Sequence, residues 1–228
     1  MENKPTTVDF IEKLSESNRV ITLGGVAVIA HGLDRNTLDA DIWLDPVGSG
    51  NEWVENVCKV MDNFPSVIPI RIAHWTSIEK EFFADLIEVD GVCRLNGMER
   101  PLDIFRKPNE IELDSFDEIW NRAKPMKDGT RLPDVIDLLL TKQLTGRAKD
   151  NYDISFLEGK ATATYLEKLS FSSAEEALEM LERFMNPEVA AAALKHPASK
   201  VREAGLSYLR ELAEAGDPFA VDLLRENS

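Results

Sequence analysis

The sequence predicts an α/β (α+β) protein in which a strand-containing first part is followed by a C-terminal helical bundle. Before about residue 113, several short segments carry the apolar runs and alternation of strands. After that point, apolar residues recur at helical spacing. A switch from strands to helices is typical of an α/β unit followed by a helical one. We place the boundary near residue 130, which gives a core over 1–130 and a helical domain over 131–228.

The composition is that of an ordinary globular protein with a strong acidic bias. Of the 228 residues, 43% are hydrophobic and 29% are charged, and the formal net charge is −15. Such a chain is unsuited to a broad basic face for nucleic acid, although a local basic pocket stays compatible with it. The densest apolar run is far shorter than the ~20 residues that span a bilayer, and the N-terminus lacks a signal-peptide pattern. We therefore expect a cytoplasmic protein with no membrane partner.

The two cysteines do not form a recognisable metal or redox motif. Cys58 and Cys93 lack CxxC spacing and a neighbouring histidine, so a zinc site is not expected. We interpret both as reduced, buried, small apolar residues.

The N-terminal elements alternate between helix and strand. Apolar residues at helical spacing over 8–14 follow two threonines that can cap a helix, so a first helix is predicted there. The segment 19–23 (RVITL) reads as a strand, which the pair Gly24-Gly25 ends. Residues 26–31 then suit a short helix, whose final His31 is interpreted as a packing or capping residue and not as a ligand.

A second strand, predicted over 37–44, places two carboxylates on one face. Because successive side chains point to opposite faces, Asp39 and Asp41 share a face with Trp43. The other face carries three apolar residues, Ala40, Ile42 and Leu44. The strand rise separates the two aspartates by roughly 6.5–7 Å, from which their side chains can converge on one or two divalent ions. Trp43 is suited either to stacking a base or to the core.

The rest of the first part contains a third aspartate inside a strand. A crossover helix is predicted over 51–64, followed by three strands over 83–89, 92–95 and 98–105. The dipeptide Asn96-Gly97 predicts a hairpin between the last two. Asp103 lies in the final strand between two apolar residues, where aspartate is disfavoured.

The second part is helical throughout. Helices are predicted over 116–123, 133–146 and 149–157, with more toward the C-terminus. The stretch PEVAAAALKHPASKVREAGLSYLRELAEAGDPFAVDLL, residues 187–224, resembles one or two degenerate HEAT-type helical hairpins. A true repeat array needs three or more units, so two interpretations stay open: packing against the preceding helices, or a platform for a partner.

Three aspartates and two glycines define the candidate chemistry. Asp39 and Asp41, joined by Asp103 from a neighbouring strand, would form the hard oxygen site that Mg²⁺ or Mn²⁺ prefers. Without metal these carboxylates raise one another's pKa. The turn at Gly24 and Gly25 offers backbone N–H groups to phosphates without an obstructing Cβ. Either motif alone is more often a plain turn or a solvated strand face, but the combination in this order is more specific.

Two stretches resemble a known family. GGVAVIAHGLDRNTLDADIWL resembles the nucleotidyltransferase superfamily signature (the DNA polymerase β-like fold), Gly-Gly or Gly-Ser followed after about ten to thirteen residues by Asp-x-Asp. The His-Gly and Arg-x-Thr-x-Asp-x-Asp patterns within it are similar to those of the bacterial AbiEii-type toxin nucleotidyltransferases. The same group has a helix with a Lys followed by a Lys/Arg-Asp-x-x-Asp segment, which is similar to LPDVIDLLLTKQLTGRAKDNYDISFL. The resemblance covers about residues 20–157 and implies a mixed-sheet core. Gly25 stands where many members have Ser, which removes a hydroxyl donor.

The resemblance implies specific roles for the residues that match. Asp39 and Asp41 would ligate metal, and Asp103 would be a metal ligand or general base. Nucleotide contacts are implied for three further residues, Gly24, Gly25 and Lys142.

Several charged residues near these motifs keep two interpretations. Arg35 and Thr37 either contact the phosphates or brace the carboxylates. From the residues alone, Lys142 is equally well a solvated helix lysine or a phosphate ligand. With the resemblance, the phosphate role is favoured. The charged cluster of Arg147, Lys149, Asp150 and Asp153 is either a substrate contact or, as we favour, a salt-bridge network between helices.

The expected function is metal-dependent transfer of an NMP group from an NTP to an acceptor hydroxyl, with Mg²⁺ or Mn²⁺ as cofactor. The acceptor is an RNA 3′ end, a protein or a small molecule: sparse basic clusters favour the last two, and the family analogy favours tRNA. The protein would be the toxin of a toxin–antitoxin or phage-defence pair, with an antitoxin as partner. The alternative is an inactive or regulatory nucleotide-binding module that docks a partner protein through its C-terminal helices.

Overall fold

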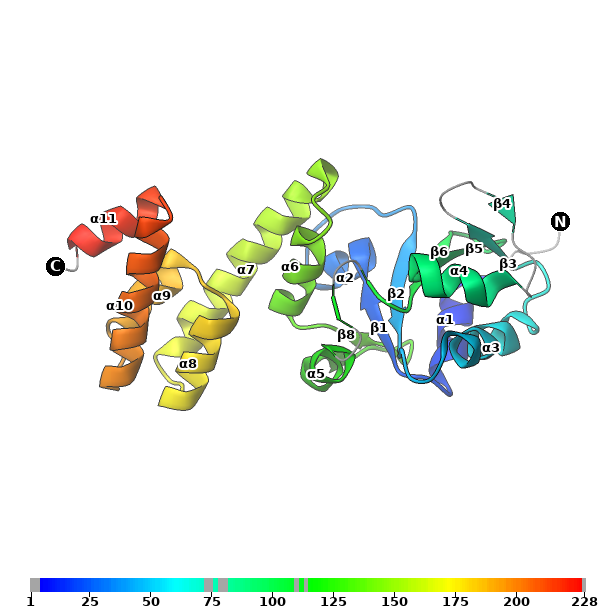
Figure 1. The fold of residues 1–228 in the computed structure, drawn as a ribbon, viewed down its shortest axis with the longest axis horizontal. Coiled ribbons are helices and arrows are strands. Elements are labelled where there is room, and N and C mark those ends of the chain that lie inside the picture. The colour runs from blue at the N-terminus through cyan, green and yellow to red at the C-terminus, as the bar shows by residue number, and fades with distance from the viewer. Residues whose placement is uncertain (1–4, 72–75, 78–81, 109–110, 113–114, 227–228) are drawn as a thin grey trace. The chain divides into compact units, whose positions relative to one another are not determined.

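The computed structural model describes residues 5–71, 76–77, 82–108, 111–112 and 115–226. The chain divides into two compact units, Met1–Ile154 and Ser155–Ser228. The first is an α/β unit built on a mixed sheet, and the second is a run of helices (Figure 1). The first unit extends past residue 130, the predicted boundary, because α6 (Val135–Gln143) also belongs to it and contacts α2 (Gly24–Ala30).

The described part of the first unit contains a mixed sheet of eight strands. Their spatial order is β4 (Thr76–Ser77), β3 (Ile68–Arg71), β5 (Val92–Asn96), β6 (Leu102–Phe105), β2 (Ala40–Leu44), β1 (Val20–Leu23), β8 (Arg131–Leu132) and β7 (Lys124–Pro125). Strand β2 runs antiparallel to β1 and parallel to β6. Asp41 and Asp103 therefore lie on the central strands β2 and β6, and Asp39 directly precedes β2. The predicted strands at 19–23 and 37–44 are present, the second shortened to Ala40–Leu44, whereas the four short strands β3, β4, β7 and β8 were not predicted.

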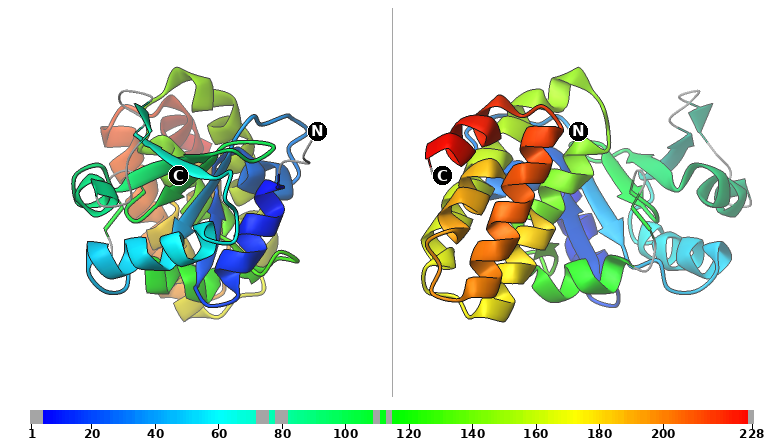
Figure 2. Two further views of the ribbon diagram at one scale, coloured as in Figure 1. Left: turned by 90° about the vertical axis from the view of Figure 1, so that its right-hand side faces the viewer. Right: turned by 60° about the vertical axis from the view of Figure 1, so that its left-hand side comes forward.

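One face of the sheet is covered by α1 (Thr7–Ser15), α3 (Gly50–Met61) and α4 (Phe83–Asp90), with α1 and α3 side by side (Figures 1 and 2). The predicted apolar face of β2 lies in this core, where Ala40, Ile42 and Leu44 are buried. The first predicted helix is present as α1 and is capped by Thr6. Its buried face differs from the prediction, because Val8 is exposed and Phe10 is buried instead.

The opposite face of β2 carries Trp43 into a second, smaller core. Trp43 is fully buried and meets the Phe116 ring edge-on at a centroid distance of 5.0 Å. Its indole N–H donates to the Arg106 carbonyl at 3.0 Å. Phe116 belongs to α5 (Ser115–Arg122), close to the predicted helix 116–123. The core interpretation of Trp43 is confirmed, and stacking on a nucleotide base is excluded by its burial.

Residues 83–89 form helix α4, so the strand predicted there is wrong. Phe83, Leu86 and Ile87 are buried at the i, i+3, i+4 spacing of a helix face. The helix ends at Gly91, which adopts the left-handed conformation with φ 65° that commonly terminates helices. A short apolar run carries too little periodicity to separate a strand from a buried helix.

The β5–β6 hairpin is present but has a longer connection than Asn96-Gly97 predicted. Leu95 pairs with Leu102, whereas a two-residue turn would have paired it with Met98. Gly97 is required for another reason: a Cβ there would lie 1.9 Å from the Ser66 carbonyl oxygen. The glycine therefore allows a close approach to the segment before β3, and the strand predicted from residue 98 begins only at Leu102.

The remaining helices follow the predicted order. After α6 come the 3-10 helix η2 (Ala148–Asp150) and α7 (Asn151–Leu169), which crosses the unit boundary. The second unit continues with α8 (Ala174–Arg183), α9 (Pro187–Ala193), α10 (Ser199–Glu214) and α11 (Pro218–Glu226). Helix α10 contacts α8, α9 and α11, and a Cβ at Gly205 would lie 2.7 Å from the Ala190 carbonyl oxygen, so the helices pack closely. The HEAT-type relationship stays a prediction.

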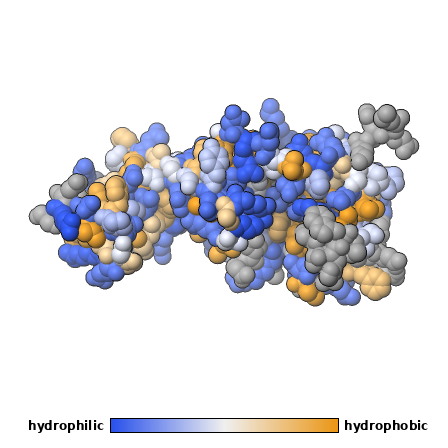
Figure 3. Space-filling view, turned by 90° about the horizontal axis from the view of Figure 1, so that it is seen from above, coloured by the Kyte–Doolittle hydropathy of each residue, from blue (hydrophilic) through white to orange (hydrophobic). Residues whose placement is uncertain are grey.

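The protein has a mainly polar surface, as its content of charged residues leads us to expect, and its two cysteines are unpaired by any disulfide. The face seen in Figure 3 is mainly hydrophilic with scattered apolar residues. In the described ranges, no helix has the length and apolar character needed to cross a membrane. Cys93 is buried, as predicted, whereas Cys58 is only half-buried, and neither cysteine forms a disulfide. Burial raises the pKa of the Cys93 thiol well above its usual value, which keeps it protonated and unreactive.

Candidate active site

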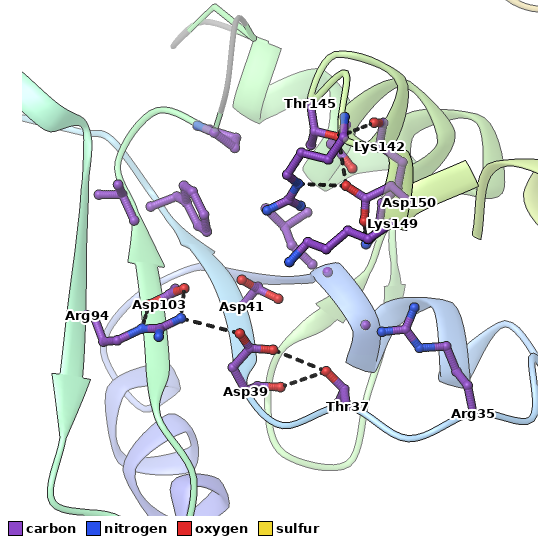
Figure 4. Close-up of a pocket in the computed structure, with 18 residues that line it drawn as sticks. Arg35, Thr37, Asp39, Asp41, Arg94, Asp103, Lys142, Thr145, Lys149 and Asp150 are labelled. Atoms are coloured by element: carbon purple, nitrogen blue, oxygen red, sulfur yellow. Dashed lines mark hydrogen bonds and ion pairs between the residues drawn. The ribbon is translucent and has the colours of Figure 1, made fainter. Parts of the chain in front are cut away.

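A cavity of about 440 Å³ in the first unit brings the predicted site residues together (Figure 4). Its lining includes all eight of them: Gly24, Gly25, Arg35, Thr37, Asp39, Asp41, Asp103 and Lys142. They come from the first residues of α2, the segment before β2, strands β2 and β6, and helix α6. Residues far apart in the chain are thus assembled around one space.

The glycine pair makes room for side chains of the site itself. Gly24 has φ +58°, and a Cβ there would lie 1.8 Å from Asp41 Oδ2. A Cβ at Gly25 would lie 2.6 Å from Thr37 Oγ1 and 2.9 Å from Arg35 Nη2. A serine at position 25 would therefore displace Thr37, whose own hydroxyl already lies beside that position. The residues at 24 and 25 must be small because the carboxylate and the hydroxyl approach the backbone so closely.

The three aspartates differ in how they are bonded. Thr37 Oγ1 donates to Asp39 Oδ1 at 3.2 Å, so Thr37 braces the carboxylate, one of its two predicted roles. Arg94 Nη2 donates to Asp39 Oδ2 at 3.3 Å. Among the described residues, the Asp41 carboxylate has neither a hydrogen bond nor an ion pair (Figure 4).

The electrostatic cost at Asp41 is large. Burial raises its pKa to about 6, and the negative charges of Asp103 and Asp39 contribute, against the smaller opposing effect of Lys142 and Arg147. A carboxylate in that environment gains strongly from a nearby cation. Asp41 is therefore the group in this cavity best suited to bind one.

Asp103 is held by an arginine that the sequence reasoning missed. Asp103 lies beside Asp41 in the parallel β2–β6 pair and opposite Arg94 in the antiparallel β5–β6 pair. Arg94 Nε and Nη2 donate to the two Asp103 oxygens, each at 2.7 Å. The signal for Arg94 was its place between two core residues of a predicted strand. Its partner depended on the hairpin register, which a two-residue turn would have set differently.

The donor set suits one hard cation held by two carboxylates. Asp41 on β2 and Asp39 just before it present carboxylate oxygens to the cavity, which is the ligand chemistry of Mg²⁺ and Mn²⁺. Asp103 does not complete a triad in this arrangement, because both its oxygens accept from Arg94. Consistently, the described residues contain no group of three or more His, Cys, Asp or Glu side chains placed to hold a metal ion.

Lys142 is neither solvated nor directed freely at the cavity. It is 5% exposed, and its Nζ lies 3.0 Å from Asp153 Oδ2 and 3.3 Å from Asp150 Oδ1. Arg35 also pairs with Asp153, and Arg147 Nε donates to Asp150 Oδ2 at 2.7 Å. We call these five residues the Asp150/Asp153 network. The predicted salt-bridge interpretation of this region is confirmed for Arg147, Asp150 and Asp153.

Lys149 stands outside that network. Its side chain is exposed and extends into the cavity toward the carboxylates (Figure 4). Within the described residues it has no ion-pair or hydrogen-bond partner. It is therefore the lysine of this region most available to an anionic ligand. By contrast, His31 lies at the end of α2 with Nε2 3.0 Å from the Pro133 carbonyl oxygen, as expected of a packing residue.

The cavity lining is more basic than the chain. Its cationic residues are Arg35, Arg94, Lys142, Arg147 and Lys149, and its carboxylates are Asp39, Asp41, Asp103 and Asp150. Five positive and four negative groups give a formal charge of +1, in a chain of −15. The acidic composition left room for a local basic pocket, and this cavity is such a pocket. An anion would be attracted to it.

A comparison of the chain with models of known protein families finds no match, and a comparison with curated proteins finds none.

Proposed function

We propose that this protein is a metal-dependent nucleotidyltransferase, which moves an NMP group from an NTP to an acceptor hydroxyl. The observation that carries the proposal is the unpaired Asp41 carboxylate, beside Asp39, in a cavity that also presents cationic side chains. A site that combines a hard-cation ligand pair with basic groups suits a metal-bound polyphosphate. The resemblance of the 24–44 stretch to the superfamily signature supports the same reaction class.

The chain's own residues would divide the work in a simple way. Asp39 and Asp41 would hold Mg²⁺ or Mn²⁺, and the bound ion would supply Lewis-acid activation of the transferred phosphoryl group. Thr37 fixes the Asp39 carboxylate through its hydroxyl. Gly24 and Gly25 let these side chains lie against the backbone.

Lys149, not Lys142, is proposed as the principal contact to the triphosphate. Lys142 is buried between two aspartates, so moving it to a phosphate would leave both without this partner. A contact between Lys149 and a phosphate would break no interaction within the described residues. Lys142 would act by holding the η2 segment in position.

We expect Lys149→Ala to raise the KM for NTP about tenfold or more with little change in kcat, because a charge-assisted hydrogen bond contributes about 1.5–3 kcal/mol. Steady-state kinetics over NTP concentration measures this split. Lys127→Ala is the matched control, since Lys127 is exposed and lies outside the cavity lining. An unchanged KM in Lys149→Ala would remove this residue from the triphosphate site.

The acceptor is proposed to be an RNA 3′ end, a protein or a small molecule, and the biological setting a toxin–antitoxin or phage-defence pair. The cavity's excess of one positive charge is small for an RNA-binding surface, which favours a protein or small molecule. The toxin-like resemblance favours RNA. A direct assay separates these acceptors.

The deciding experiment is transfer of label from α-phosphate-labelled NTPs. The purified protein is incubated with each of the four NTPs, Mg²⁺ or Mn²⁺, and total cell extract, and the products are digested separately with RNase and protease. We expect metal-dependent incorporation that EDTA abolishes and that Asp41→Asn lacks. Asp85→Asn, an exposed aspartate on α4, is the matched control and retains it. NTP binding without transfer to any acceptor would instead favour the regulatory module.

A further inference from the structure

We infer that the guanidinium of Arg94 occupies the place of a second cation, so that the site takes a single divalent ion at Asp39 and Asp41. This inference rests on the proposed function, which it deepens by fixing the metal stoichiometry. It removes Asp103 from the set of metal ligands and assigns it the role of anchoring Arg94. Arg94 is then a positioning residue for the carboxylates.

The first support is the geometry of the pair. Two parallel hydrogen bonds of 2.7 Å join Arg94 to both oxygens of Asp103, the bidentate arrangement that arginine forms with carboxylates. The side chains are only 14% and 9% exposed. Their residues face each other across paired strands, so the backbone holds both ends. Such a pair is built into the sheet and is unlike a solvated surface contact.

The second support is what else the guanidinium touches. Arg94 Nη2 also lies 3.3 Å from Asp39 Oδ2, so one cation bridges the carboxylates of Asp103 on β6 and of Asp39, which directly precedes the neighbouring strand β2. A second cation would supply positive charge between these carboxylates, and Arg94 already supplies it. Asp41, on the same strand face as Asp39, is left outside the contact and without a partner in the described part of the chain.

The third support is the charge balance. Three ionised carboxylates and Arg94 together carry a formal charge of −2, which one divalent ion neutralises. A second divalent ion would bring this group to +2 beside a guanidinium that cannot lose its proton. The cluster is therefore matched to one ion.

The test counts Mn²⁺ ions bound per chain, from the loss of the free-ion EPR signal during a titration at about pH 8. We expect one ion in the wild type and in Arg94→Lys, which keeps the charge. We expect two in Arg94→Gln, where Asp103 becomes available. The double variant Arg94→Gln/Asp103→Asn keeps the formal charge of the pair, and we expect one ion with an affinity within about threefold of wild type. Loss of a true ligand would cost more than the 10- to 100-fold of an outer-shell partner.

The outcomes separate this inference from the proposed function. The inference would be overturned if the wild type bound two Mn²⁺ ions or if Arg94→Gln bound only one. It would also be overturned if the double variant bound Mn²⁺ more than about tenfold more weakly than the wild type. Because the double variant removes both members of the Arg94–Asp103 pair, it leaves neither of them buried without the other, and it keeps the test decisive if Arg94→Gln fails to fold. Asp41→Asn reports on the proposed function: it must lose Mn²⁺ binding whether the wild type binds one ion or two. Mn²⁺ binding unaffected by Asp41→Asn, or absent from the wild type, would overturn both.

Discussion

Asp41→Asn is expected to abolish nucleotidyl transfer and yet stabilise the metal-free protein. Loss of a direct metal ligand should lower the transfer rate by more than about 10²-fold, since even outer-shell partners contribute 10- to 100-fold. At about pH 8 the free energy of unfolding should rise by about 2–3 kcal/mol, because the substitution removes a carboxylate whose pKa is raised from 3.8 to about 6. The melting temperature of the metal-free protein should rise by about 5–10 °C.

The sign of this effect depends on pH. The native state binds the Asp41 proton more tightly than the unfolded chain, so this group's stabilisation is fully present below pH 3.8 and is lost as the pH rises through about 6. Asn does not titrate. The variant and the wild type should therefore have similar stability near pH 4 and diverge up to about pH 7. A variant less stable than the wild type at about pH 8 would contradict the electrostatic account of the site.

Tryptophan fluorescence is the appropriate measurement, because Trp43, Trp53 and Trp120 belong to the first unit and the segment 155–228 contains no tryptophan. Mg²⁺ should raise the wild-type melting temperature, as any ligand of the native state does. The variant should show no such rise. Asp85→Asn is the matched control and should follow the wild type in both pH and metal dependence.

Asp153→Ala is expected to destabilise the first unit by about 3–5 kcal/mol, the usual cost of removing one member of a buried ion pair. Asp153 is fully buried and pairs with both Arg35 and Lys142. Its loss leaves Lys142 buried with one carboxylate in place of two. The fluorescence melting temperature should fall by about 10 °C or more.

Two controls give this prediction its meaning. Glu16→Ala removes the partner of Lys13 in an exposed ion pair of the first unit, where the Lys13 and Glu16 side chains are 44% and 63% exposed, and it should change stability by less than about 1 kcal/mol. The double variant Asp153→Ala/Lys142→Met should recover part of the loss, because it leaves no unmatched buried lysine charge. Equal stability of Asp153→Ala and the wild type would show that the Asp150/Asp153 network does not hold this wall of the cavity.

Much of the fold followed from local patterns. The alternation around Asp39 and Asp41 fixed which side of β2 faces the main core, because a strand has only two faces and one of them was apolar. The first helix was predictable from its capping threonine. Helix α4 was not, since eight residues with few polar neighbours fit either periodicity.

The candidate site was predictable in its members but not in their pairing. All eight proposed residues line one cavity, because the aspartates and glycines stand at strand ends where side chains converge. Arg94 escaped prediction since its partner depends on the hairpin register. Lys142 illustrates the same limit: helical periodicity placed it on α6, but only the tertiary arrangement brings Asp150 and Asp153 against it.

The order of the cavity-lining segments along the chain has a consequence for biosynthesis. Asp39, Asp41 and Asp103 are all translated before Lys142 and Lys149, so a nascent chain carries the carboxylates while the cationic wall is still missing. During that interval Asp41 lacks the favourable effect of Lys142 and Arg147 on its charge. A partly made protein therefore has the proposed metal ligands without the proposed triphosphate contact. We expect the proposed activity to begin only when residues up to about 154 have left the ribosome and folded.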